Sequence, residues 1–149
     1  MVDLSGGYGG YIADGSRTYS LGPLSTQMRD THRFILDLHE SIETQLKPGA
    51  IPSEVYSNIQ YRLARPSFVP HFMGENQVKF NAHGVGLELD EIPVIAPEFG
   101  SPLEANVVVA LESKVFYPGL GRVGVENTYL ITGTGCERLT TSPQEIFER

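Results

Sequence analysis

The sequence predicts a single α+β domain in which helices cover a mostly antiparallel sheet. Three observations predict this class: a glycine-rich hairpin at the N-terminus, two helical patterns between Ser25 and Leu63, and strands joined by tight turns in the second half. With 149 residues, of which 40% are hydrophobic, the chain is long enough to bury one core. We therefore treat residues 1–149 as one domain.

The charge and the cysteine content exclude several classes of protein. A formal net charge of -7 leaves no basic stripe for phosphates, so nucleic acid is not expected as a partner. Cys136 is the only cysteine, which rules out an internal disulfide, and the N-terminus lacks the features of a signal peptide. No apolar run approaches the roughly 20 residues of a membrane span. We expect a cytoplasmic protein that does not enter membranes.

The N-terminal segment predicts a β-hairpin. Ser5-Gly-Gly-Tyr-Gly-Gly10 is a glycine-rich connection, and the second strand is expected to run from about residue 11 to residue 21. Asp3 and Asp14 flank this connection, so the hairpin can fold both carboxylates toward one point. The alternative is that each aspartate only stabilises a turn, as Asp14-Gly15 pairs often do.

Two helices are expected after the hairpin. Apolar residues recur at helical spacing from Ser25 to Lys47, where Lys47-Pro48-Gly49 ends the pattern. Pro52 begins a second helix that ends before Pro66. His32 and His39 share one face of the first helix, and we expect surface positions for them because no set of carboxylates accompanies them. Both helices are expected to cover the sheet.

Turn residues divide the second half into strands and irregular stretches. We expect irregular structure at Pro66–Gln77 and Ile92–Ser101. Strands are predicted at Val78–Ala82, Val107–Tyr117, Val123–Thr132 and Cys136–Leu139. Ser142-Pro-Gln-Glu145 has the spacing of a capping box and predicts a short C-terminal helix.

Two glutamates interrupt apolar strands, where a carboxylate needs a partner. Glu112 stands in the middle of Val107–Tyr117, and Glu126 follows Gly124, a glycine that permits close approach of another backbone. An unpaired buried ion costs several kcal/mol, so each glutamate needs a proton, a salt bridge or a cation. Lys114 lies on the same strand face as Glu112 and is the structural alternative there. On adjacent antiparallel strands the two glutamates would repel unless cations bridge them.

His83 opens the sequence His-Gly-Val-Gly-Leu-Glu-Leu-Asp-Glu-Ile-Pro. A single histidine at a strand end is more often hydrogen-bonded in a structural role than a metal ligand. Together with carboxylates, however, a neutral imidazole suits Mn, Fe, Co or Zn and argues against a calcium site. We therefore predict a site for two divalent cations, with one histidine and four carboxylates as ligands: Asp3, Asp14, His83, Glu112 and Glu126.

In type and order these residues resemble the ligands of the pita-bread metallopeptidase family, which includes methionine aminopeptidase, Xaa-Pro aminopeptidase, prolidase and creatinase. The resemblance covers nearly the whole chain. The segments that carry it are Val-Asp3-Leu-Ser-Gly-Gly-Tyr, Tyr-Ile-Ala-Asp14-Gly-Ser-Arg-Thr, His83-Gly-Val-Gly, Glu112, and Val-Glu126-Asn-Thr with the strand that follows it. The continuation Gly86-Leu-Glu-Leu-Asp-Glu-Ile-Pro93 is most similar to the Xaa-Pro peptidases.

The resemblance implies a curved sheet with helices on its outer face and a two-metal site in its concave face. The five residues above are the implied ligands of manganese, with Co, Zn or Fe as alternatives. The implied reaction is hydrolysis of a short Xaa-Pro peptide by a hydroxide held between two ions, and Glu112 also takes the proton of the attacking water. The peptide is the implied partner, and a homodimer is the expected assembly.

Three departures from the family pattern qualify these implications. Ala82 replaces a glycine before His83, and Asp90 replaces a histidine that contacts the scissile peptide, which makes Asp90 a candidate substrate contact. The chain also begins just before Asp3, where family members have a preceding half, so we expect a partial domain and poor catalysis by the chain alone. The alternatives are a creatinase-like C–N hydrolase, a lyase, or a non-catalytic fragment that retains the fold.

Overall fold

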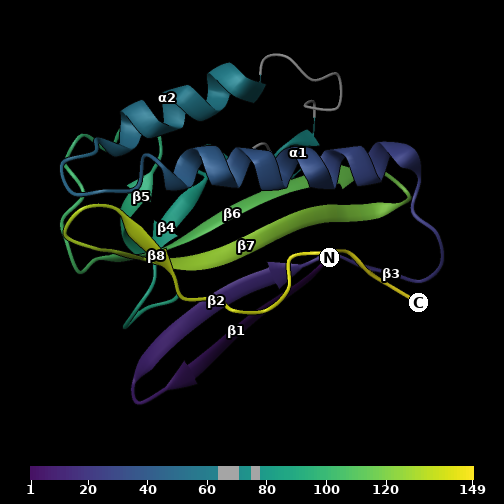
Figure 1. Ribbon diagram of the computed structural model, residues 1–149, viewed down its shortest axis with the longest axis horizontal. Helices are drawn as coiled ribbons and strands as arrows, with labels where there is room; N and C mark the ends of the chain where they lie inside the picture. The colour runs from purple at the N-terminus through teal and green to yellow at the C-terminus, as the bar shows by residue number, and fades with distance from the viewer. Residues whose placement is uncertain (64–70, 75–77) are drawn as a thin grey trace.

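One antiparallel sheet forms the centre of the computed structural model, which describes residues 1–63, 71–74 and 78–149 (Figure 1). Its strands lie in the order β1-β2-β7-β6-β4-β5, and β8 pairs with β7 beside this path. The bounds are β1 (Val2–Tyr8), β2 (Tyr11–Arg17), β4 (Ala82–Gly84), β5 (Glu91–Ile95), β6 (Val108–Tyr117), β7 (Gly121–Ile131) and β8 (Cys136–Arg138). The predicted α+β class is confirmed.

The N-terminal hairpin is confirmed, but its connection is shorter than predicted. β1 and β2 pair along their whole length, starting from Val2 opposite Arg17. Only Gly9 and Gly10 remain for the turn, and both have positive φ, 60° and 87°. A side chain disfavours this backbone region, so the two glycines allow the tight reversal.

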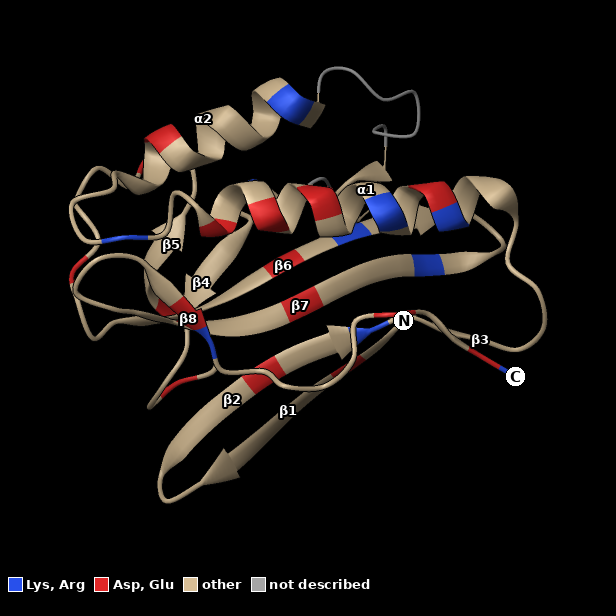
Figure 2. Cartoon of the chain, in the orientation of Figure 1, with Lys and Arg blue, Asp and Glu red and all other residues tan. Residues whose placement is uncertain are grey.

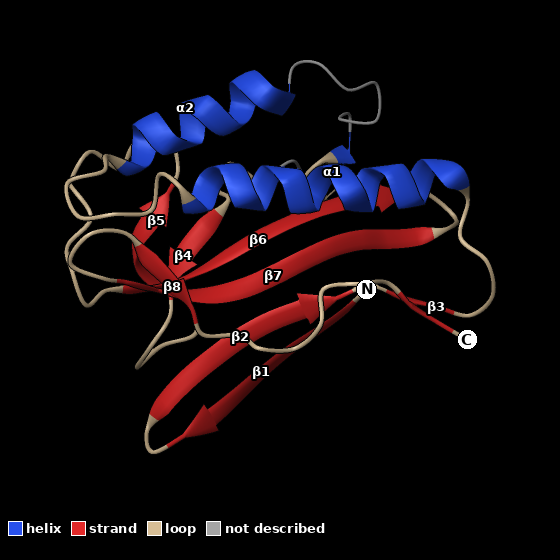
Figure 3. Ribbon diagram, viewed as in Figure 1, coloured by secondary structure: helices blue, strands red, loops and turns tan. Residues whose placement is uncertain are grey.

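Two helices cover one face of the sheet (Figure 3). α1 (Thr26–Glu43) begins after Ser25, whose hydroxyl accepts a hydrogen bond from the Met28 N–H at 3.3 Å. α2 (Pro52–Leu63) begins at its proline, as predicted. α1 packs against β6 and β7, and α2 packs against β5 and α1. Their apolar side chains join those of the strands in one core, which includes Ile35, Leu38, Ile42, Val55, Ile59, Leu111, Val115, Val125 and Tyr129.

His32 and His39 lie between α1 and the sheet, so the predicted surface positions are wrong. Their exposed fractions are only 5% and 1%. His32 precedes Ile35 by one helical turn, which places the histidines on the stripe that faces the sheet. Burial lowers the pKa of His39 to about 3, and the positive charge of Arg17 contributes to the shift. His39 is therefore a neutral part of the interface.

The region around β4 differs from the prediction. β4 begins at Ala82, where the predicted strand Val78–Ala82 ends, and His83 consequently lies inside the strand. The predicted irregular stretch Ile92–Ser101 instead begins within β5. β5 contains Pro93 and is the outermost strand, where one side needs no ladder hydrogen bonds. Most of the predicted loop Pro66–Gln77, residues 66–70 and 75–77, lies outside the described residues.

Residues 140–149 form no helix, so the helix predicted from Ser142 is wrong. Instead β9 (Phe147–Glu148) pairs in parallel with β3 (Tyr19–Ser20), and the rings of Tyr19 and Phe147 stack with centroids 4.9 Å apart. The Gln144 side chain accepts a hydrogen bond from Asn127 on β7 at 2.6 Å. The C-terminal segment is therefore held by contacts with β3 and β7, and its residues do not form the hydrogen bonds of a helix cap.

β6 and β7 approach each other closely at Gly124, which lies opposite Lys114. A Cβ atom at Gly124 would lie 2.7 Å from the Ser113 carbonyl oxygen and 2.9 Å from the Lys114 Cβ. Both distances are shorter than real contacts allow. The close backbone approach predicted at this glycine is confirmed.

Gly124→Ala is expected to destabilise the fold by about 1–3 kcal/mol, because the backbone of β6 must move to admit a methyl group. Urea unfolding followed by circular dichroism measures the change. Gly135→Ala is the matched control, since a Cβ at Gly135 meets nothing within 4 Å. Equal stability of the two variants would contradict the close approach.

Candidate metal site

The predicted ligands of the central strands share the face of the sheet opposite the helices. Glu126 on β7 stands opposite Ser16 on β2 and opposite Glu112 on β6. Asp14 lies two residues before Ser16 and shares its face, because side chains alternate along a strand. The β6 residue that pairs with His83 lies two residues before Glu112, so the side chains of His83 and Glu112 share one face of the sheet. Figure 2 shows the resulting row of acidic positions across β2, β7 and β6.

Three of these side chains converge on one point. One ligand atom from each of Asp14, His83 and Glu126 lies within 4.8 Å of the others. The Nε2 atom of His83 is 4.0 Å from Asp14 Oδ2 and 3.7 Å from Glu126 Oε1. Nδ1 lies 3.0 Å from the Gly84 carbonyl oxygen, and a proton donated there leaves the Nε2 lone pair facing the carboxylates. This donor set fits Mn, Fe, Co or Zn, so the three residues could hold such an ion.

Asp3 and Glu112 lie outside this three-residue group. Asp3 is exposed on β1, opposite Ser16. Glu112 is only 5% exposed, and its Oε2 atom contacts Lys114 Nζ, the structural partner that the sequence offers. Burial raises the pKa of Glu112, and Lys114 opposes this shift. The structure therefore brings three of the five predicted ligands together and holds Glu112 on a lysine.

Glu126 is fixed by a hydroxyl group that the sequence analysis missed. Its side chain is buried, and Ser16 Oγ donates a hydrogen bond to Oε2 at 2.7 Å. This bond leaves the Oε1 atom directed at His83. Ser16 therefore orients one ligand of the group, as hydrogen-bonded neighbours of metal ligands commonly do.

Side chains hold β2 against β7, since only one residue pair joins their backbones. The Thr18 hydroxyl donates to the Gly124 carbonyl at 2.8 Å and accepts from the Gly124 N–H at 3.0 Å. Thr128 Oγ1 donates to the backbone oxygen of Asp14 at 2.8 Å. The signal in the sequence was a run of polar residues, 16–18, in a strand that pairs with an apolar one.

Arg17 is buried at this junction and uses all five of its N–H donors. Nη1 donates to the backbone oxygens of Ser16 and Glu126 at 2.8 and 2.7 Å. The other three bonds, 2.6–3.0 Å long, reach Pro143 O, Asn127 Oδ1 and Ser142 O. Arg17 thus ties β2 to β7 and to the C-terminal segment beside Glu126. In the sequence, Arg17 stands out only as part of the motif around Asp14.

The convergence of charges shifts two pKa values. Burial raises the pKa of Asp14 to about 6, and the carboxylates of Glu126 and Asp3 add to the shift. Burial alone would lower the pKa of His83, but the nearby carboxylates of Glu126 and Asp90 help to raise it to about 9. Without a cation, a proton on His83 therefore balances the carboxylates.

Metal affinity is expected to fall as the pH falls, because a cation must displace these protons. Between pH values of about 6 and 9, His83 is protonated and Asp14 is not. One proton then leaves for each ion bound, which lowers the affinity by about tenfold per pH unit. Below a pH of about 6 the slope steepens because Asp14 is protonated too. Titrations against a chelator measure this, and a pH-independent affinity would contradict His83 as a ligand.

Asp90 lies at the edge of the site. Its Oδ1 atom is 3.3 Å from His83 Nδ1, and its side chain is 70% exposed. The segment that carries it lies close to β4, because a Cβ at Gly84 would be 2.6 Å from the Ile92 carbonyl oxygen. Asp90 therefore combines a contact with His83 and access from solvent.

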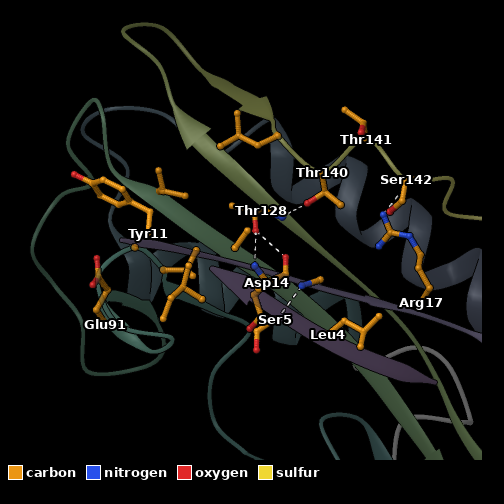
Figure 4. A pocket seen from close by; sticks show the side chains of 18 of the residues that line it. Leu4, Ser5, Tyr11, Asp14, Arg17, Glu91, Thr128, Thr140, Thr141 and Ser142 are labelled. Atoms are coloured by element: carbon orange, nitrogen blue, oxygen red, sulfur yellow. Dashed lines mark hydrogen bonds between the residues drawn. The ribbon is translucent and has the colours of Figure 1, made fainter. Parts of the chain in front are cut away.

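A cavity of about 1030 Å³ opens beside Asp14 (Figure 4). Its wall includes the apolar side chains of Leu4, Tyr11 and Val85. Figure 4 shows Thr128 beside Asp14, with a dashed line for their hydrogen bond. Of the three residues in the group, Asp14 alone is among the described residues that line this cavity, which is large enough for a small ligand.

The antiparallel sheet, its outer helices and the histidine–carboxylate group define an α+β domain with a candidate metal site. The profile of metallopeptidase family M24 matches residues 1–133, and the chain belongs to this family. It is 30% identical over 147 residues to the Xaa-Pro dipeptidase of Pyrococcus furiosus, covering 99% of this chain and 41% of that protein. The predicted family is therefore confirmed.

Solved structures confirm the pita-bread fold. The X-Pro aminopeptidase of Thermotoga maritima superposes with a TM-score of 0.88 at 28% identity, covering 99% of this chain and 40% of that one. The N-terminal domain of the FACT complex subunit SPT16 from Eremothecium gossypii has a TM-score of 0.83 at 21% identity and shares the fold alone. The chain spans about 40% of the length of the curated dipeptidases that it matches.

Within the described residues, no helix is long and apolar enough to cross a membrane. The cytoplasmic location, the homodimer and the absence of a nucleic-acid partner stay predictions from the sequence. The names of the dipeptidases and of the aminopeptidase describe enzymes that act on peptides.

Proposed function

We propose that this chain contributes the metal centre of a peptidase that hydrolyses short Xaa-Pro peptides. The observation that carries the proposal is the convergence of Asp14, His83 and Glu126 within 4.8 Å in a member of family M24. Manganese is the preferred ion, ahead of cobalt, zinc and iron, because a mixed imidazole–carboxylate set suits these metals. Bound there, divalent cations supply a nucleophilic water at neutral pH and polarise the scissile carbonyl.

The second cation of the proposed pair would use Glu112 and Asp3. Both side chains lie on the face that carries Glu126, and Glu112 stands directly opposite it. Glu112 is also the proposed general base, which accepts the proton of the attacking water. Its burial supports this role, because burial raises the pKa of a carboxyl toward neutral pH.

The surroundings of the ligands support binding of a small peptide. The cavity beside Asp14 offers apolar walls to an uncharged side chain. Asp90 is the proposed substrate contact, since it is largely exposed and lies beside His83. An acidic residue at this point favours a substrate with a positively charged group, such as the free amine of a dipeptide.

Two observations favour a second candidate function, cleavage of other small C–N compounds. Asp90 stands where the resemblance leads one to expect a histidine, and Lys114 contacts the proposed base Glu112. Both change the charge around the reacting bond. A creatinase-like hydrolase or a lyase is therefore the alternative enzyme, and a non-catalytic domain is the third reading, because a fold alone does not fix function.

The test is a hydrolysis assay on manganese-loaded protein with Xaa-Pro dipeptides, dipeptides without proline, and creatine. We expect slow, chelator-sensitive release of proline, reduced by roughly 100-fold or more in Glu112→Gln, which keeps the size of the base and removes its charge. Glu98→Gln, on an exposed residue, is the matched control. Selective cleavage of another substrate would establish the alternative enzyme. The absence of chelator-sensitive turnover on every substrate would contradict a catalytic role.

A further inference from the structure

One hydroxyl group holds the backbone of the predicted ligand Asp14. Thr128 Oγ1 donates a hydrogen bond to the Asp14 carbonyl oxygen at 2.8 Å and accepts one from the Asp14 N–H at 3.4 Å. Figure 4 shows these bonds between the two residues. Thr128 is only 4% exposed, so water cannot easily replace the hydroxyl as a partner.

These two bonds stand where the backbone ladder between β2 and β7 would continue. Among the described residues that ladder has one residue pair, and the register places Thr128 opposite Asp14. The backbone of Thr128 is bound elsewhere, because its N–H donates to Thr140 Oγ1 at 2.8 Å and its carbonyl oxygen accepts from the Leu139 N–H at 2.8 Å. The side chain of Thr128 therefore makes the connection to Asp14 that its backbone does not make.

The place of the Asp14 carboxylate depends on how β2 lies against β7. Its Oδ2 atom is 4.0 Å from Nε2 of His83, and its Oδ1 atom accepts a hydrogen bond from the Gly15 N–H at 2.9 Å. Gly15 belongs to the same strand as Asp14 and moves with it. The bond to Gly15 therefore orients the carboxylate within β2, but it cannot fix the distance to His83 or to Glu126 on β7.

A second threonine makes the same kind of connection at the other end of the junction. The Thr18 hydroxyl donates to the Gly124 carbonyl oxygen at 2.8 Å and accepts from the Gly124 N–H at 3.0 Å. The two threonines differ in what they hold, since Thr128 binds the backbone of a predicted ligand and Thr18 binds a glycine. The chain thus contains a matched pair of threonines, of which one acts directly on a predicted ligand.

We propose that Thr128 is a positioning residue of the metal site, which places the Asp14 carboxylate beside His83 and Glu126. Its hydroxyl holds β2 against β7 at the ligand, and Thr140 holds Thr128 in turn. Residues that bind and orient metal ligands typically contribute about 10–100-fold to metal affinity. The inference rests on the proposed function, because it concerns a ligand of the proposed centre.

The test is calorimetric titration of the metal-free chain with Mn²⁺ at constant pH, repeated in competition with a chelator. Thr128→Val, which keeps the shape of the side chain and removes the hydroxyl, should weaken binding by roughly 10–100-fold. Thr128→Ser keeps the hydroxyl and should restore most of the affinity. Thr18→Val is the matched control, because it loses two bonds of the same kind at Gly124 and should bind nearly as tightly as the wild type.

Hydrogen exchange of the metal-free chain gives a second measurement. The backbone amide of Asp14 should exchange faster in Thr128→Val than in the wild type, because it loses its acceptor. Far-UV circular dichroism checks that each variant is folded. If Thr128→Val does not fold, Thr140→Val replaces it, since this change removes the acceptor of the Thr128 N–H. Thr140→Val should also weaken Mn²⁺ binding, and an unchanged affinity counts against the proposal.

Three results would overturn the inference: wild-type affinity in Thr128→Val, an equal loss in Thr18→Val, or a loss that Thr128→Ser does not restore. His83→Ala separates the inference from the proposed function. If Mn²⁺ binds to His83→Ala as tightly as to the wild type, the proposed centre itself is wrong. If binding depends on His83 and does not respond to Thr128, only the role of Thr128 is wrong.

Discussion

Replacing His83 by alanine is expected to weaken binding of a metal ion at the group of Asp14, His83 and Glu126 by more than 100-fold. Loss of a neighbour that only orients a ligand typically costs about 10–100-fold in metal affinity, so loss of a ligand should cost more. His83 is also the one nitrogen ligand of the group, and its Nε2 atom lies within 4.0 Å of both carboxylates. Without the imidazole, the remaining oxygen ligands should discriminate less between manganese and calcium.

Isothermal titration with Mn²⁺ and Ca²⁺ measures both effects. Glu126→Gln should show a comparable loss, because it removes the charge of a buried ligand and keeps its shape. Glu98→Gln is the matched control, since this carboxylate is exposed and lies outside the group. If Glu98→Gln lowered the affinity as much as Glu126→Gln, the ion would be held by the general negative charge of the chain.

Arg17→Leu is expected to lower the free energy of unfolding by about 3–5 kcal/mol, because a hydrogen bond to a charged group contributes about 1.5–3 kcal/mol and Arg17 makes several of them. Arginine donates five hydrogen bonds here, and leucine leaves their acceptors without a partner. The bonds to Ser16 and Glu126 join the backbones of two strands that share one residue pair. The loss should therefore separate β2 from β7.

Urea unfolding measures the stability, and hydrogen exchange of the backbone amides in β2 locates the change. Arg33→Leu is the matched control, because the Arg33 side chain is 74% exposed and pairs with Asp30 across the surface of α1. Arg17→Lys should recover part of the loss, since lysine keeps the charge but cannot reach all the acceptors. If Arg17→Leu and Arg33→Leu were equally stable, the junction would not depend on Arg17.

The sequence predicted best the elements whose patterns are long and uninterrupted. β6 and β7 follow from continuous apolar runs on either side of a glycine-rich turn, and α1 follows from its apolar spacing. These features are local, so a single sequence carries them. β5 and β9 escaped prediction, and β3 was predicted only as the end of the second hairpin strand, because tertiary pairing, rather than propensity, forms these short elements.

The errors have a common physical cause, which is competition from distant partners. Ser142 is followed by a capping pattern, but the backbone carbonyls of this segment accept hydrogen bonds from Arg17 instead. His32 and His39 are polar, yet their places on α1 face the sheet. Arg17 is far from Ser142 in the sequence, and the sheet strands are far from the two histidines. Periodicity alone therefore cannot reveal these contacts.

The candidate site shows the same limit. The register of the strands explains why Glu126 and Glu112 are neighbours, as their isolated positions in apolar strands predicted. The convergence of Asp14 with His83 could not be derived from spacing, because two helices lie between them in the chain. It was predicted from the residue types and from the family resemblance. The contact between Lys114 and Glu112 was the structural alternative in the sequence and is present in the fold.

The most direct test of the metal centre is anomalous diffraction from crystals of the metal-free chain soaked in Co²⁺ or Zn²⁺. We predict a strong peak at roughly 2.0–2.3 Å from Asp14, from Glu126 and from Nε2 of His83, the usual range for oxygen and nitrogen ligands. A second peak next to Glu112 would agree with the proposed pair of ions. Ions bound only at other carboxylates, with no peak between Asp14, His83 and Glu126, would contradict the assignment.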